Sequence, residues 1–285
     1  MKPRIIANYR CKVGESPLWH PRDKCLYWTD ILTGRMFRYH PTTGTHEQFY
    51  QGEKVGGFTI QTDGSLLLFM ERGTIRTWNK GQLTTWIEGI AEEHETRFND
   101  VIADPAGRVF CGTMPTKDRL GRLYRLDTDA KLTKLLEGIG CSNGLGFSPD
   151  RRTLYYTDSP VRKIYAFDYC QLTGGISNQR VFVQTAPEDG YPDGLTVDGR
   201  GFVWSARWGG ACVICYSPDG LEERRINLPA RFITSLAFGG DSLSDIYITS
   251  ALGEEDLDES AAAGALFSVN LGIRGIPEFF SGVHV

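Results

Sequence analysis

The sequence lacks the long apolar runs by which a chain is anchored in a membrane or exported. Its N-terminal segment, MKPRIIANYRCKVGESP, contains no apolar stretch of signal-peptide length. No window approaches the roughly 18 consecutive apolar residues that a membrane-spanning helix needs. We therefore predict a cytoplasmic protein without a transmembrane segment.

Paired cysteines and a strong net charge are also missing. The 7 cysteines are an odd number and are scattered along the chain, which predicts reduced thiols. Cys212 and Cys215 form a CxxC, but there is no second CxxC and no His pair at ligand spacing. Two residues of a buried strand are therefore a better interpretation than a zinc site. The formal net charge of -4 gives no reason to expect nucleic acid or an anionic membrane as partner, and no obligatory protein partner is indicated.

Long amphipathic helices are absent, and six repeats occupy the chain instead. Each repeat has a short apolar strand, a small or polar break and a second apolar strand, with turn residues at both ends. The first core residues of the repeats lie 40 to 49 residues apart: Leu26, Leu66, Val109, Leu154, Val203 and Ile246. A period in the forties with about four strands per unit is typical of a β-propeller. We predict an all-β, six-bladed β-propeller that occupies residues 1–285 as a single domain. The acidic segment GEEDLDES at 253–260 is expected to be a solvated loop, with a lid as the alternative.

Four polar residues share one position in this repeat. Ten or eleven residues before the first core residue stand Glu15, Asn99, Asn143 and Asp193, and the other two repeats have Gly56 and Ser235 there. Equivalent positions of a propeller surround one axis, so we expect the four polar side chains to converge at one mouth of the central channel. A metal in that channel would explain them, because two carboxylates brought together without a cation repel each other.

Carboxylate and amide oxygens favour a hard divalent cation, and the absence of His and Cys at these positions argues against a thiolate or imidazole zinc site. Three or four protein oxygens also leave coordination positions open, as a catalytic metal requires. Each residue has another interpretation. Asn and Asp before Gly are common turn residues, Glu15 could be a solvated carboxylate, and Arg97 could be a surface cation rather than a ligand contact.

The chain resembles the senescence marker protein (regucalcin)/gluconolactonase/luciferin-regenerating-enzyme family of six-bladed propellers. The resemblance is carried by GESPLW, RFNDVIADPAGRVFCGTM, SNGLGFSPDRRTLYYTDS, YPDGLTVDGRGFVWSARWGG and AGALFSV. It implies a divalent metal held by Glu15, Asn143 and Asp193, substrate contacts from Arg97 and Asn99, and hydrolysis of sugar-acid lactones. Family members often carry a longer, acidic loop after CGTM, where this chain has the short, basic PTKDRLG, so the exact sugar stays open.

We therefore expect a metal-dependent hydrolase that opens hexono- or pentonolactones. The metal would polarise the carbonyl, and Asp193 would be the general base, with Glu15 as the alternative. The cation is one of Ca, Mg, Mn, Zn or Fe(II). Two alternatives are a propeller that binds an ion or ligand without catalysis and a hydrolase of other esters or organophosphates. No Gly-x-Ser-x-Gly elbow is present, and no His stands at the shared offset, so neither a serine nor a His-based route is favoured.

Overall fold

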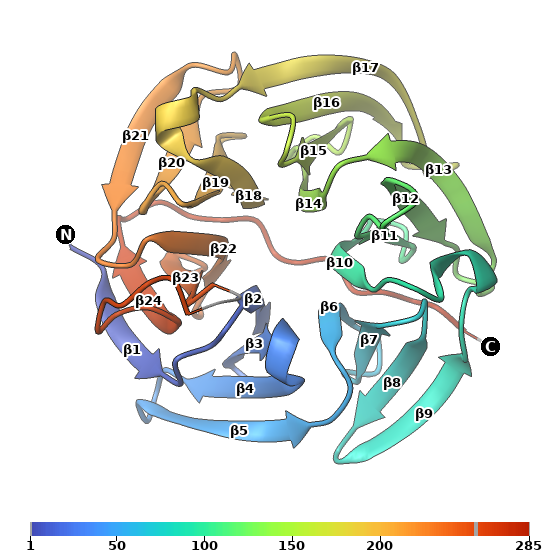
Figure 1. Cartoon of the computed structure of the whole chain (residues 1–285), viewed down its shortest axis with the longest axis horizontal. Coiled ribbons are helices and arrows are strands. Elements are labelled where there is room, and N and C mark those ends of the chain that lie inside the picture. The colour runs from blue at the N-terminus through green and yellow to red at the C-terminus, as the bar shows by residue number, and fades with distance from the viewer. Residues whose placement is uncertain (1, 254–255, 285) are drawn as a thin grey trace.

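The computed structural model describes residues 2–253 and 256–284, which form six four-stranded antiparallel sheets around a central channel (Figure 1). This arrangement confirms the predicted six-bladed β-propeller. The first three sheets follow the chain. They consist of β2 (Gly14–His20), β3 (Cys25–Asp30), β4 (Arg35–His40) and β5 (Thr45–Gln51); β6 (Val55–Ile60), β7 (Leu66–Met70), β8 (Ile75–Asn79) and β9 (Gln82–Ile87); and β10 (Phe98–Ala103), β11 (Val109–Thr113), β12 (Gly121–Leu126) and β13 (Leu132–Ile139).

The fourth and fifth sheets are built in the same way, and the sixth joins the two ends of the chain. They consist of β14 (Ser142–Phe147), β15 (Thr153–Asp158), β16 (Lys163–Cys170) and β17 (Gly175–Gln184); β18 (Tyr191–Val197), β19 (Val203–Trp208), β20 (Cys212–Tyr216) and β21 (Glu222–Asn227); and β22 (Phe232–Gly239), β23 (Asp245–Ala251), β24 (Ala265–Asn270) and β1 (Arg4–Asn8). Because β1 pairs with β24, the N-terminal strand closes the ring. Short 3-10 turns lie in connecting loops: η1 (Ile31–Thr33), η2 (Ala91–Glu93) and η3 (Pro187–Asp189).

The core lies between neighbouring sheets, where alternating apolar residues of adjacent blades pack together. Between the second and third sheets, for example, Phe69 meets Phe98 edge to face at 5.3 Å between ring centroids, and both rings are fully buried. Cys212 and Cys215 are buried in β20, and all seven cysteines are free. The strand interpretation of the CxxC is thus confirmed.

A C-terminal strap, residues 271–284, crosses the ring after the last strand (Figure 1). The sequence pattern did not predict it. Backbone hydrogen bonds of 2.8 Å tie the strap to segments of four sheets or their loops, through Leu243, Gly199, Ile60, Gly107 and Thr128. Phe279 and Phe280 of the strap pack under Arg151 and Arg22, respectively. The strap therefore closes one end of the channel and links blades that are distant in the sequence.

None of the described residues belongs to a helix that is long and apolar enough to cross a membrane. Of the acidic segment 253–260, residues 254–255 lie outside the described residues. Asp258 of the same segment is buried, and its carboxylate accepts hydrogen bonds from the backbone N–H groups of Arg231 (2.6 Å) and Ser260 (2.9 Å). Asp258 is therefore tied to the sixth blade, whereas Asp256, Leu257 and Glu259 are exposed, as expected of a solvated loop.

Candidate metal centre and active site

The four strands that carry the predicted site residues are bulged where those residues stand. Each of the six innermost strands slips register against its neighbour at the shared repeat position. The slips fall between Glu15 and Leu18, Val55 and Gly57, Phe98 and Val101, Asn143 and Leu145, Pro192 and Leu195, and Ile233 and Leu236. A β-bulge leaves a residue out of the ladder and re-aims its side chain, which is why bulges recur beside active sites. The same local bulge therefore occurs in all six inner strands around the axis.

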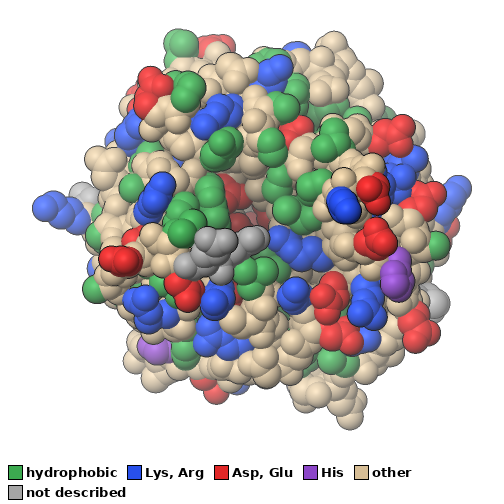
Figure 2. All heavy atoms as spheres, in the orientation of Figure 1, with side chains coloured by type: hydrophobic (Ala, Val, Ile, Leu, Met, Phe, Trp, Pro, Cys, Tyr) green, Lys and Arg blue, Asp and Glu red, His purple; other side chains and the backbone are tan. Residues whose placement is uncertain are grey.

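All five predicted site residues line one cavity of about 370 Å³ at the centre of the ring. Glu15, Asn99, Asn143 and Asp193 are each at most 6% exposed, and Arg97 reaches the same cavity from the segment before β10. Among the described residues that line this cavity, neither Gly56 nor Ser235 appears, so the polar groups gather on four of the six blades. Figure 2 shows acidic side chains deep in the central opening.

The Asn-Gly and Asp-Gly pairs lie within strands, so the interpretation of Asn143 and Asp193 as turn residues is wrong. Asn143 belongs to β14 and Asp193 to β18. The glycines that follow Asn143 and Asp193 allow neighbouring inner strands to lie close together. A Cβ at Gly144 would lie 2.5 Å from the Asp193 carbonyl oxygen, and one at Gly194 would lie 2.2 Å from Ser235 Oγ. These glycines bring neighbouring inner strands, and with them the site residues, close together.

The two amides are oriented by hydrogen bonds. Asn99 Nδ2 donates to Asn143 Oδ1 at 2.7 Å, and Arg97 Nη1 donates to Asn99 Oδ1 at 2.6 Å. Asn143 Nδ2 donates to Ser159 Oγ at 2.8 Å, and that hydroxyl donates to the Pro192 carbonyl at 2.6 Å. Asn143 Oδ1 accepts one hydrogen bond from a neutral amide and keeps a lone pair, while Asn99 Oδ1 already accepts from a cation. Asn143 is therefore better placed than Asn99 to offer an oxygen to a metal.

A third carboxylate, which the sequence analysis did not single out, lies near Glu15 and Asp193. Asp100 is 8% exposed, and its Oδ1 has no hydrogen-bond partner among the described residues. Burial raises the pKa of Asp100 to about 7, against the opposing effect of Arg97. Asp100 directly follows Asn99, and the bulge in β10 accounts for two successive residues facing the interior.

Burial and mutual repulsion raise the pKa values of the two predicted carboxylate ligands well above their ordinary range. For Glu15, burial acts first, and the charges of Asp100 and Asp193 add to it; the Ser16 N–H, 2.8 Å from Oε2, and Arg97 oppose the shift. For Asp193, burial and the charge of Asp100 raise the pKa, and the Gly194 backbone N–H and Arg97 lower it. Three buried acids with one nearby guanidinium therefore hold an excess of negative charge.

This donor set fits a hard divalent cation. Two carboxylates and one amide oxygen are the ligands such ions prefer, and a dication would neutralise the excess charge that burial makes unfavourable. Within the described ranges, no three His, Cys, Asp or Glu side chains group closely enough to hold a metal by themselves. The candidate centre therefore depends on the Asn143 oxygen as well as on the acids.

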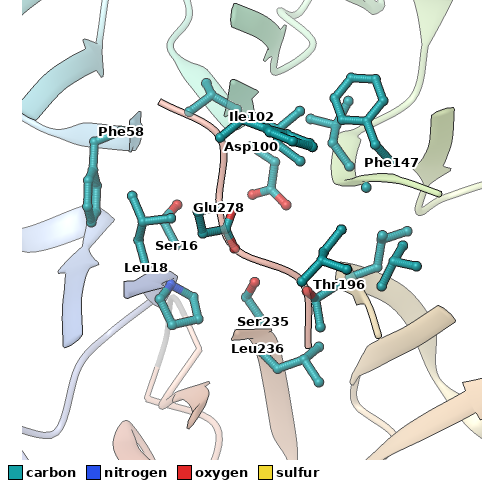
Figure 3. Close-up of a pocket in the computed structure, with 18 of the residues that line it drawn as sticks. Ser16, Leu18, Phe58, Asp100, Ile102, Phe147, Thr196, Ser235, Leu236 and Glu278 are labelled. Atoms are coloured by element: carbon teal, nitrogen blue, oxygen red, sulfur yellow. The ribbon is translucent and has the colours of Figure 1, made fainter. Parts of the chain in front are cut away.

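A smaller chamber of about 80 Å³ lies further along the channel, toward the strap (Figure 3). Its lining is mostly apolar, with the polar side chains Ser16, Asp100, Thr196, Ser235 and Glu278 facing inward. Glu278 comes from the strap, and burial raises its pKa to about 7. The strap thus closes the channel at one end, and the candidate metal centre is reached from the opposite end.

An apolar collar surrounds the entrance at this opposite end. The term denotes the apolar residues that line the upper wall of the 370 Å³ cavity: Val13, Met114, Cys141, Pro160, Tyr191 and Trp208. Figure 2 shows hydrophobic side chains gathered around the central opening. No described residue of the segment 115–121, which contains the basic PTKDRLG, lines this cavity. Arg119 of that segment pairs instead with the buried Glu93 of η2.

Known proteins share both the sequence pattern and the fold. A model of the SMP-30/Gluconolactonase/LRE-like region matches residues 13–252. The chain is 46% identical to the pentonolactonase XacC of Haloferax volcanii and 36% identical to the regucalcin of Danio rerio, in each case over 98% of both chains. It is also similar to the solved structure of regucalcin, a calcium-binding protein from Agrobacterium tumefaciens, with a TM-score of 0.89, 26% identity, and coverage of 97% of this chain and 96% of that one. The family resemblance expected from the sequence motifs is therefore confirmed, and the chain belongs to the SMP-30/Gluconolactonase/LRE-like family.

Proposed function

We propose that this protein is a divalent-metal-dependent hydrolase of small sugar-acid lactones. The observation that carries the proposal is the convergence of Glu15, Asn143 and Asp193, from three blades, on the floor of one cavity. The names of relatives support it, since the Haloferax volcanii protein is a pentonolactonase. Because the site draws on four blades, we propose further that residues 1–285 act as one domain. The seven free cysteines support a location in the cytoplasm.

In this proposal Glu15, Asn143 and Asp193 hold one cation: Ca, Mg, Mn, Zn or Fe(II). When bound, such an ion supplies Lewis-acid polarisation of the lactone carbonyl. The collar and the closed lower end limit the access of bulk water, which strengthens each polar contact on the cavity floor. Arg97 and the Asn99 amide face the cavity beside the ligands and would hydrogen-bond the hydroxyls of the substrate.

Asp193 is the proposed general base. Without a cation, burial and the charge of Asp100 raise the pKa of Asp193. A cation held by the same carboxylate would lower its basicity, so the proposal rests on the place of Asp193 on the cavity floor. It takes a proton from the attacking water as the water oxygen bonds to the carbonyl carbon. The bond from that carbon to the ring oxygen then breaks, and Asp193 returns the proton to the ring oxygen, which leaves as a hydroxyl. Glu15 is the alternative base, but its Oε2 already accepts the Ser16 N–H.

The test compares metal-stripped protein with and without each added cation, using gluconolactone and pentonolactones and following acid release. Asp193→Ala is expected to abolish turnover while the fold is retained, and Asp219→Ala, in an exposed turn, is the matched control. Full activity of Asp193→Ala would remove Asp193 from the mechanism. If a cation raises the melting temperature and no lactone is opened, the protein is a binding propeller rather than a hydrolase.

A further inference from the structure

The candidate active site has two levels with different chemistry. Polar side chains line the floor, whereas the six collar residues that line the upper wall offer carbon and sulfur surfaces. Of the floor residues, Arg97 and Asn99 can bond hydroxyls on the lactone ring itself. A substituent that projects from the ring toward the entrance would meet the collar.

Two aromatic rings of the collar are held in place by their neighbours. The Trp208 ring lies against the Phe232 ring, with 4.6 Å between centroids. The Tyr191 ring is covered by the Arg162 guanidinium at 3.9 Å, and Arg162 Nη1 also donates to the Gly190 carbonyl at 2.6 Å. Tyr191 is 41% exposed, although a large apolar side chain is ordinarily turned away from water. Rigid rings with one face left open are suited to contact with a ligand.

Further large apolar side chains are exposed at the same end of the ring, although they do not line the cavity. Leu120, Val161 and Leu257 are 53%, 45% and 56% exposed, and each lies in the loop between the second and third strands of its blade. Tyr191 begins the innermost strand of its blade, at the same end of the ring. Four of the large exposed hydrophobic residues therefore belong to the face that holds the entrance, in agreement with the hydrophobic ring seen in Figure 2.

We propose that this site also hydrolyses lactones that carry an unbranched alkyl substituent, which the collar binds; this inference rests on the proposed lactonase function. A hydroxylated substituent would lose water at the collar without gaining a hydrogen-bond partner, whereas an alkyl chain gains from the same burial. The reaction is the same hydrolysis: water oxygen bonds to the carbonyl carbon, the bond from that carbon to the ring oxygen breaks, and the ring oxygen leaves as the hydroxyl of a hydroxy acid.

The experiment measures kcat/KM of the metal-loaded protein for γ-lactones with substituents from methyl to pentyl, beside a pentonolactone. We expect kcat/KM to rise by about fourfold for each methylene that the collar buries. A flat or falling series, with the pentonolactone still hydrolysed, overturns the alkyl inference alone. If no lactone of either kind is opened, the proposed function fails and the inference fails with it.

Two variants test the collar directly. Trp208→Ala is expected to reduce the pentyl-to-methyl ratio of kcat/KM by several-fold, and Trp208→Phe, which keeps an aromatic ring against Phe232, is expected to retain most of it. Leu172→Ser is the matched control, because Leu172 is 89% exposed in the loop between β16 and β17, away from the cavity. An unchanged ratio in Trp208→Ala would show that the collar does not bind the substituent.

Discussion

Replacing Glu278 of the strap by Gln should stabilise the protein at pH 8 and leave it nearly unchanged at pH 5. Burial raises the pKa of Glu278 from 4.5 to about 7, and the other charged side chain among the described residues of the chamber, Asp100, is also an acid. Between these two pKa values the folded state keeps a proton that the unfolded chain has lost. The stability of the wild type therefore falls as the pH rises from about 4.5 to about 7.

The size of the effect follows from the pKa difference. Each pKa unit corresponds to about 1.4 kcal/mol, so the ionised Glu278 costs at most about 3.5 kcal/mol above pH 7. We expect less than this limit, because the side chain is partly accessible. Gln carries no charge at either pH, so Glu278→Gln removes the cost. For a chain of this size, the gain at pH 8 corresponds to a rise in Tm of roughly 6 °C at most.

The assay is thermal and urea unfolding of both proteins at pH 5 and pH 8, in excess chelator so that bound cations do not contribute. Glu223→Gln, on the exposed edge of β21, is the control and should show no pH-dependent difference. An advantage of Glu278→Gln that is equal at both pH values, or larger at pH 5, would refute the assignment of a raised-pKa carboxyl to this position.

Three further predictions concern the candidate centre. Asp193→Asn removes one of three buried acids, so in chelator at pH 8 the variant should have a higher Tm than the wild type. Added cation should raise the Tm of the wild type only. A variant that has the higher Tm both with and without cation would contradict this prediction. Gly144→Ala places a Cβ 2.5 Å from the Asp193 carbonyl oxygen, so the free energy of unfolding in urea should fall by about 1–3 kcal/mol and lactone turnover should be lost. Gly282→Ala, where a Cβ has room, should change neither quantity. Arg97→Lys loses the planar guanidinium that donates to Asn99, so kcat/KM should fall about tenfold or more, and an unchanged value would exclude Arg97 from substrate binding.

The fold and the gathering of the site residues could be predicted because each sequence repeat forms one blade, and successive blades are related by rotation about the channel axis. Once the repeats are aligned, residues at one offset, such as Glu15 and Asp193, must lie around one axis. The bulges that recur at this offset in all six inner strands provide the physical basis of that rule. The metal and the roles of the individual residues stay proposals, since the repeat fixes positions and not chemistry.

Features outside the repeat could not be predicted from the sequence. Asp100 stands one residue past the shared offset, where an unbulged strand would turn its side chain away from the channel. The strap has no periodic pattern, so neither its path across the ring nor the place of Glu278 could be inferred. The collar is assembled from loops and strand ends of unequal length, and residues such as Met114 and Trp208 come together only after the ring has closed.

The pairing of β1 with β24 has a consequence for synthesis of the protein. Strand β1 has no partner until β24, which ends at Asn270, has been synthesised. Until then the blades form an open arc, and the acidic side chains of the candidate site face solvent rather than a cavity. We therefore expect the proposed cation to bind only after β1 has paired with β24, and a chain truncated before β24 to remain both without a cation and vulnerable to proteases.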